Sequence, residues 1–336
     1  MEWMGSYLTE RKQPVWIDHT FSDWLDVNIG VPQGSILGPL LFIIFANDLP
    51  YSLDCELDQY ADDSTMTSSK ANIDEINIEL NENCEKVSTW MIENELCLNA
   101  DKTHLMVGGT SQRLHNVKTE ENLDVTMDGF QLTESKEKCE KLLGVTFQPN
   151  LKWTKHVQEV QEKLKDRLSG LLKTRHIVTY PFRKTVAEGI FMSVLTYCIP
   201  AWGGLDQGDL QDLQVMQNKA AQIVLNLPPR SNRNMMYTSL SWLTVNQLIF
   251  FHSVLAVSRI RKTSEPEYLT RFLSNDNLRG NIIIPHSTLT LAKKSFCFRG
   301  AENWNIVPEE IRSLEKIDCF KRELKKWTLT NVDRFT

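Results

Sequence analysis

The sequence predicts an α+β protein, with a strand-rich first part and a helical second part. Between residues 14 and 147, short β-prone runs alternate with turn signals such as Asp128-Gly129. From about residue 154 onward, apolar residues recur at helical spacing. The 336 residues are enough for one large domain or about two or three small ones, each with its own core.

The first 50 residues combine a hairpin, a glycine loop and a helix. Residues 14–27 predict the hairpin, with a polar turn between two short strands. Pro32 and Gly34 then indicate a loop, in which the glycine allows close approach of the backbone to a ligand. Ser35 is placed to cap a helix that continues to about Asp48. Because this helix is apolar nearly all round, we expect it to be buried.

Two adjacent carboxylates, Asp62 and Asp63, follow in the hairpin predicted for residues 53–66. Polar or small residues surround the pair, which is typical of a tight turn between strands. Adjacent acids repel each other unless a cation lies between them. Mg²⁺ prefers such oxygens together with substrate phosphates, so the pair suits phosphoryl or nucleotidyl transfer by two metal ions. A solvated turn is the alternative, since an Asp-Asp pair alone is a weak motif.

The remaining elements follow from periodicity and turn signals. An amphipathic helix over residues 73–94 has its apolar positions at helical spacing. After it we expect a strand at 102–107, a loop at 108–122, and short strands within 124–132 and 139–147. Further helices are predicted at 154–174, 181–197, 209–225, 240–261 and 320–329, with a loop at 263–286.

The glycine loop and the acidic hairpin together resemble the reverse transcriptases of non-LTR, LINE-like retrotransposons. Residues 31–42, Val-Pro-Gln-Gly-Ser-Ile-Leu-Gly-Pro-Leu-Leu-Phe, look like that family's template- and nucleotide-positioning loop. Residues 60–63, Tyr-Ala-Asp-Asp, look like its catalytic hairpin. Weaker similarities to the palm, the primer grip, the start of the thumb and the C-terminal region fall at residues 98–103, 142–145, 151–156 and 303–312.

The resemblance implies a role for each of these motifs. Asp62 and Asp63 would be the catalytic residues and would hold two Mg²⁺ ions, with Asp62 as the main ligand. The residues expected to line the nucleotide, template and primer end are Gln33, Gly34, Tyr60, Ala61 and Lys102, and the primer grip falls on Leu143 and Gly144. For Lys102, an ordinary surface lysine is the alternative.

The formal net charge of −6 is awkward for a protein that binds nucleic acid, but the charges are unevenly distributed. Acidic residues predominate over residues 48–140, and basic residues predominate over 152–184. We expect Lys155, Lys163 and Arg167, on the helix predicted there, to contact a nucleic-acid backbone. The alternative is the solvated face of an amphipathic helix.

The resemblance also implies an architecture, a partial polymerase right hand. Residues 1–150 would form partial fingers and a palm of antiparallel strands with packed helices. Residues 151–230 would form a helical thumb, and residues 231–336 a mainly helical C-terminal region. The partners implied are an RNA template, a DNA primer and dNTPs.

One departure from the family pattern bears on activity. The family has a further catalytic aspartate on a strand before its Trp-x-x-Ser-Tyr-Leu segment, which here begins at Trp3. We therefore expect an N-terminally truncated RNA-directed DNA polymerase that is weak or inactive alone. A catalytically dead nucleic-acid-binding remnant and an inert gene fragment are the alternatives.

Cysteine usage and hydropathy indicate the compartment. The seven cysteines are scattered, without zinc-finger spacing, and the N-terminal residues lack the pattern of a secretory signal. We expect reduced thiols and an intracellular location, nuclear or cytoplasmic. No run of eighteen apolar residues occurs, so no membrane-spanning helix is predicted. His156 and His176 stand alone and are expected to be surface or thumb residues rather than ligands; the sequence leaves the oligomeric state open.

Overall fold

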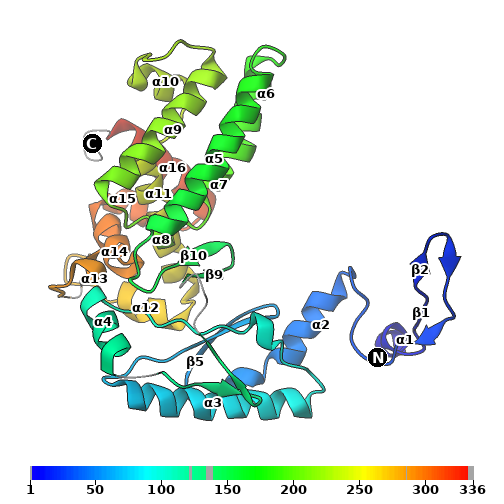
Figure 1. Cartoon of the computed structure of the whole chain (residues 1–336). Helices are drawn as coiled ribbons and strands as arrows, with labels where there is room; N and C mark the ends of the chain where they lie inside the picture. The colour runs from blue at the N-terminus through cyan, green and yellow to red at the C-terminus, as the bar shows by residue number, and fades with distance from the viewer. Residues whose placement is uncertain (1, 121–122, 134–138, 285, 332–336) are drawn as a thin grey trace. The chain divides into compact units, whose positions relative to one another are not determined.

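The chain folds as two compact units that combine helices with short strands, which confirms the α+β class (Figure 1). The computed structural model describes residues 2–120, 123–133, 139–284 and 286–331. The first unit comprises Met1–Leu105 and Gln112–Ser135, and the second comprises Met106–Ser111 and Lys136–Thr336. These units follow packing, so the division into palm, thumb and C-terminal region stays a prediction.

The strands pair antiparallel and only two by two across the described residues. The palm sheet and the right-hand arrangement therefore stay predictions. The elements before residue 135 are α1 (Glu2–Leu8), β1 (Lys12–Gln13), β2 (Trp16–Ile17), β3 (Thr20–Phe21), β4 (Leu25–Asp26), α2 (Leu37–Ala46), η1 (Leu49–Ser52), β5 (Glu56–Tyr60), β6 (Asp63–Thr67), α3 (Ile73–Glu93), η2 (Ala100–Lys102), α4 (Ser111–Glu120), β7 (Thr126–Met127) and β8 (Phe130–Gln131).

Helix α3 organises the core of the first unit, as its apolar periodicity predicts. Asn72 caps the helix, because its side chain accepts a hydrogen bond from the Glu75 N–H. The buried stripe of α3 includes Cys84, Val87 and Trp90, and it packs with the β7–β8 hairpin and the end of α2. Burial raises the pKa of the Cys84 thiol to about 11, so this cysteine behaves as a small apolar residue.

Helix α2 forms where expected, but the prediction that it is buried is wrong. The Ser35 hydroxyl accepts a hydrogen bond from the Gly38 N–H at 3.0 Å, which confirms the predicted cap. Only Gly38 and Ala46 of α2 are buried, whereas Ile43 is 57% and Ile44 63% exposed. The helix contacts the core only near its C-terminal end. Although its sequence is apolar all round, much of its surface is not covered by another element among the described residues.

Several further predictions of local structure are wrong. Residues 111–120, expected as loop, form α4, and residues 267–273 in the other predicted loop form α12. The strand expected after Lys102 is reduced to a single β-bridge at Leu105 within the described residues 103–107, and Lys102 itself ends the 3₁₀ turn η2. Helix α4 is polar, so it lacks the apolar periodicity that predicts a helix, and α12 has only seven residues, too few to show a clear period.

The second unit is almost wholly helical. It contains β9 (Glu140–Leu142), β10 (Val145–Phe147), α5 (Thr154–Thr174), α6 (Tyr180–Ala187), the π-helical turn η3 (Glu188–Met192), α7 (Ser193–Thr196), α8 (Ile199–Trp202), α9 (Gln207–Leu225), α10 (Arg233–Leu240), α11 (Val245–Thr263), α12 (Glu267–Leu273), α13 (Thr290–Lys293), α14 (Phe296–Ile306), α15 (Glu309–Arg312) and α16 (Ile317–Thr330).

The core of this unit lies around α11, which packs against helices from both its sides in sequence. Helix α11 begins with a capping box between Thr244 and Gln247 and buries residues on most of its surface. Helices α5 and α9 run side by side (Figure 1). The Trp304 and Phe320 rings stack at 6.0 Å, so these aromatics serve the core rather than base stacking. The predicted helices at 154–174, 209–225, 240–261 and 320–329 are confirmed, with ends shifted by a few residues.

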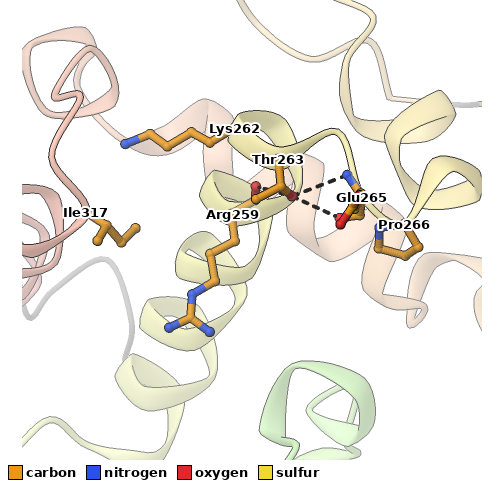
Figure 2. Close-up of a pocket in the computed structure, with 6 residues that line it drawn as sticks. All are labelled: Arg259, Lys262, Thr263, Glu265, Pro266 and Ile317. Carbon is orange, nitrogen blue, oxygen red and sulfur yellow. Dashed lines mark hydrogen bonds between the residues drawn. The ribbon is translucent and has the colours of Figure 1, made fainter. Parts of the chain in front are cut away.

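One helical stretch of the second unit, Arg233–Thr263, is long and apolar enough to span a membrane by length and composition alone. In the most apolar 18-residue window of this stretch, 67% is buried inside the fold, which is typical of the core helix of a folded domain. The second helix of this stretch, α11, ends at an open pocket of about 780 Å³ (Figure 2). None of the predicted site residues lines this pocket, whose residues are Arg259, Lys262, Thr263, Glu265, Pro266 and Ile317.

Candidate active site

The predicted catalytic motif forms the tip of the β5–β6 hairpin. Tyr60 pairs with Asp63 in the antiparallel register, so Ala61 and Asp62 make a two-residue turn. Ala61 adopts a φ of +54°, in the left-handed region that tight hairpin turns require. All four side chains are exposed. The sequence therefore places both carboxylates at an open turn, as predicted.

The base of this hairpin is fastened to α3 by polar contacts at both ends. At the start of β5, the Asp54 N–H donates to the buried Asn83 Oδ1 at 2.8 Å, and the Asp54 carboxylate pairs with Lys86. After β6, Glu79 accepts a hydrogen bond from Ser68 and pairs with Lys70 at 2.9 Å. The Ser68 hydroxyl, then Lys70, lowers the pKa of Glu79. The acidic tip therefore projects from a fixed stem.

The donor set at the tip suits a hard cation only in part. Asp62 and Asp63 offer carboxylate oxygens, which Mg²⁺ accepts together with phosphate oxygens of a substrate. Among the residues that the structure describes, no group of three His, Cys, Asp or Glu side chains gathers closely enough to hold a metal ion. Two carboxylates fit a site that a bound nucleotide completes, and the solvated turn remains the alternative.

The glycine loop lies before α2 and exposes both predicted contact residues. Gln33 and Gly34 are exposed, and Gly34 has a φ of +78° with no atom near the position of a Cβ. The guanidinium of Arg11 donates to the carbonyls of Ile29 and Gly30, at 3.2 and 2.7 Å. Arg11 thus fixes the start of the loop, a role that the sequence did not reveal.

The cap of α2 has a second partner that was also missed. The Tyr7 hydroxyl donates to the Ser35 hydroxyl oxygen at 2.6 Å. Both Tyr7 and Arg11 lie in the short segment before the N-terminal hairpin, so this segment holds the loop at two points. Lys102 is exposed on the separate turn η2 of the same unit, and its contact with a triphosphate stays a prediction.

The predicted primer grip forms the turn of the β9–β10 hairpin, in the second unit. Leu142 pairs with Val145, and Leu143 and Gly144 make the turn with φ values of +48° and +80°. Leu143 is 40% exposed, and the Tyr197 ring covers Gly144. The hairpin is confirmed, while its contact with a primer stays a prediction.

The cations predicted to contact nucleic acid project from α5 into solvent. Lys155, Lys163 and Arg167 are all exposed, and no ion pair within the described part of the chain involves them. Exposed cations without acidic partners are available to phosphate oxygens. The alternative, a solvated face of an amphipathic helix, would show the same exposed cations in the free protein.

His156, also on α5, is a core residue, so of its two expected positions the surface one is wrong and the thumb one stays a prediction. It is 3% exposed, and its Nδ1 accepts a hydrogen bond from the Thr146 N–H at 3.2 Å. Burial lowers the pKa of His156 to about 4, so the ring is neutral near pH 7. The Trp202 ring packs against it at 5.4 Å.

Comparisons with known proteins relate the chain to a family of polymerases. Residues 3–147 match the family described as reverse transcriptase (RNA-dependent DNA polymerase), which spans both the glycine loop and the acidic hairpin. This part of the chain is therefore similar to the reverse transcriptases. No solved structure matches the chain.

Relatives of the chain are named as polymerases of a transposon and of a mobile element. The chain is 26% identical over 270 residues to the probable RNA-directed DNA polymerase from transposon BS of Drosophila melanogaster, covering 77% of this chain and 29% of that protein. It is 24% identical over 234 residues to the RNA-directed DNA polymerase from mobile element jockey of the same species, covering 66% of this chain and 25% of the relative. The chain thus spans less than a third of the length of these relatives.

Proposed function

We propose that this chain carries part of an RNA-directed DNA polymerase, whose partners are an RNA template, a DNA primer and dNTPs. The observation that carries the proposal is the Tyr60–Asp63 turn, two exposed carboxylates on a fixed hairpin stem. Its position inside the region that matches the reverse transcriptase family supports the same reading.

Asp62 and Asp63 would hold two Mg²⁺ ions, with Asp62 as the main ligand. Bound there, Mg²⁺ would neutralise the charge that develops on the transferred phosphoryl group. Tyr60 and Ala61 flank the carboxylates, where the primer end would lie. The exposed Gln33 and Gly34, on the loop fastened by Arg11, and Lys102 would line the nucleotide and template.

We further propose that the chain has little polymerase activity by itself. The described residues bring together only two carboxylates at the turn, and each missing ligand lowers metal affinity. Primer extension on an RNA template with Mg²⁺ and dNTPs tests both parts. We expect at most trace extension, which Asp62→Ala abolishes. Robust extension would contradict weak activity, and extension that survives Asp62→Ala would contradict the assigned site.

A catalytically dead nucleic-acid-binding remnant is the second candidate. The exposed Lys155, Lys163 and Arg167, which form no ion pair within the described residues, favour it, because backbone binding needs cations and no catalysis. A titration of RNA–DNA duplex affinity against salt, combined with the extension assay, separates the two. Duplex binding without any extension, in both the parent chain and Asp62→Ala, identifies the remnant.

The regional assignments complete the proposal. Residues 1–150 would act as partial fingers and palm, 151–230 as the thumb, and 231–336 as a C-terminal region. We also propose an intracellular location, nuclear or cytoplasmic, which cell fractionation of the tagged chain would test.

A further inference from the structure

The turn that the family resemblance assigns to the primer grip is held by one side chain from a distant helix. The Tyr197 hydroxyl donates to the Leu143 carbonyl at 2.7 Å, across 54 positions of sequence. The same ring lies 3.6 Å from where a Cβ on Gly144 would be. Tyr197 therefore contacts both residues of the turn, one through its hydroxyl and one through its ring.

A second connection returns from Tyr197 to the same hairpin. The Trp202 indole N–H donates to the Tyr197 carbonyl at 2.7 Å. The Trp202 ring packs on His156, and His156 accepts the backbone N–H of Thr146 on β10. Tyr197, Trp202 and His156 thus close a loop of contacts that begins and ends on the β9–β10 hairpin. We call these three residues the hairpin bracket.

The backbone of the bracket is itself tightly constrained. Cys198, directly after Tyr197, adopts a φ of +49°, which directs the chain from α7 into α8. Trp202 and Ile199 at the two ends of α8 are fully buried in the core. Because α8 is anchored in the core directly after Cys198, the chain at Tyr197 is held next to the hairpin.

An isolated hairpin with so short a ladder is marginal in water, so its position depends on such contacts. Further contacts bind it to α5: the Thr146 hydroxyl donates to Glu159 at 2.9 Å, and the Lys155 N–H donates to Gln148 at 2.8 Å. These contacts all lie at the strands or beyond them. Among the contacts named here, only those of Tyr197 reach the Leu143–Gly144 turn.

We propose that Tyr197 is a positioning residue for the primer strand, because it holds the Leu143–Gly144 turn in a fixed place relative to the thumb helix. The inference rests on the proposed function, since it requires that this turn meets a primer. Contacts with a primer end demand placement to a fraction of an ångström, which a free hairpin tip does not provide.

The first experiment measures the bracket without any nucleic acid. Tyr197→Phe removes only the hydroxyl and keeps the ring on Gly144, so the fold is retained. Tyr180→Phe is the matched control, since Tyr180 is 40% and Tyr197 51% exposed, and both belong to the same unit. We expect amide hydrogen exchange in residues 140–147 to be about fivefold faster in Tyr197→Phe and unchanged in Tyr180→Phe. Equal exchange in both variants would overturn the inference.

The second experiment measures where the primer end lies. An RNA–DNA primer-template carries a photoreactive group at the primer 3′ end, and crosslinked peptides are mapped by mass spectrometry. We expect crosslinks in residues 140–147 of the parent chain and a severalfold lower yield in Tyr197→Phe. Duplex affinity should stay within about twofold, because the cations of α5 are unchanged. A merely structural tyrosine would leave the crosslink yield unchanged.

The outcomes separate this inference from the function on which it rests. Failure of the parent chain to bind duplex would refute nucleic-acid binding, and with it this inference, whatever the exchange data show. Binding with crosslinks elsewhere would refute the grip but leave the polymerase assignment standing. Crosslinks at the hairpin with equal yields from both chains would refute the role of Tyr197 alone.

Discussion

The two units of this chain differ in how their apolar residues are used. In the first unit, Trp16 is 62% and Ile43 57% exposed, although both belong to regular elements. In the second unit, Phe191 and Trp202 are fully buried in an extensive core. The comparison shows that the N-terminal strands and α2 are specified by local signals, such as turns and caps. The helices of the second unit are specified by the burial of their apolar side chains.

This difference has an energetic consequence. Burying a large apolar side chain contributes about 1.5–3 kcal/mol to the free energy of unfolding. The second unit has many buried side chains of this kind, whereas the N-terminal hairpin and α2 have few. The first unit depends more on polar contacts, notably those of Asn83 and Glu79 with the acidic hairpin. We therefore expect the two units to respond differently to the same kinds of substitution.

The largest effect is expected from truncating a core aromatic. Phe191→Ala should lower the free energy of unfolding of the second unit by about 3–5 kcal/mol, because it leaves a cavity in a packed core. Ile43→Ala on α2 should cost under about 0.5 kcal/mol, because the side chain is already in solvent. Urea unfolding followed by hydrogen exchange in each unit measures both. Equal costs would contradict the comparison.

A pH effect should follow from the buried His156. Its pKa of about 4 in the folded chain lies below the ordinary unfolded value, so protonation favours unfolding. The stability it contributes is full above about pH 6.5 and is lost progressively as the pH falls toward 4. We expect the second unit to lose about 2 kcal/mol from this residue between pH 8 and pH 5.

The control for that pH effect is His156→Asn, whose side-chain oxygen can still accept the Thr146 N–H but does not titrate. The slope of stability against pH should be smaller in this variant. Burial also lowers the pKa of His252, so part of the slope should remain. If the slope of stability against pH is unchanged in His156→Asn, the titration of His156 does not cause the pH effect.

Removing the exposed cations of α5 should change binding but not stability. The combined variant Lys155→Ala, Lys163→Ala and Arg167→Ala should weaken RNA–DNA duplex binding by about tenfold or more and reduce the salt slope by about 2.7. Fluorescence anisotropy at several salt concentrations measures this. Replacing Lys325, an exposed lysine on α16, with alanine provides the comparison. An unchanged slope in the α5 variant would mean that these side chains form only a solvated face.

A smaller effect than that of the core aromatic is expected at the stem of the acidic hairpin. Asn83→Ala leaves the Asp54 N–H without its partner and should destabilise the first unit by about 1–2 kcal/mol. Exchange in residues 54–67 should increase more than exchange in α4. If exchange there is unchanged, the polar contacts do not hold the stem, and the contrast between the units fails.

The elements that the sequence predicted well are those with a local signal. Asp128-Gly129, with both φ values positive, forms the predicted turn, and Asn72 and Ser35 cap the predicted helices. Burial was less predictable, because the covering of a helix depends on distant residues. The apolar sequence of α2 is compatible with either a buried or an exposed helix, and the structure leaves Ile44 exposed.

For the candidate site, sequence motifs identified the hairpin turns but not the side chains from elsewhere in the chain that hold the site's loops in place. The Tyr-Ala-Asp-Asp turn and the Leu143-Gly144 turn lie at hairpin tips, as predicted. Arg11 and Tyr197 act on those loops from elsewhere in the chain, and no spacing rule connects them. The only prior signal for Tyr197 is the proline at 200 after an apolar helix, which indicates a helix end and not a contact.

The most direct test of the central claim is Mn²⁺ binding at the acidic turn in the presence of a dNTP. Mn²⁺ substitutes for Mg²⁺, and electron paramagnetic resonance reports the ion that remains free. We predict that the parent chain with dNTP lowers the free signal below that of the same dNTP alone. Asp62→Asn with Asp63→Asn should return the signal to the level of dNTP alone, while Asp58→Asn on the same hairpin should not. Equal binding by the parent chain and the Asp62–Asp63 variant would contradict the account.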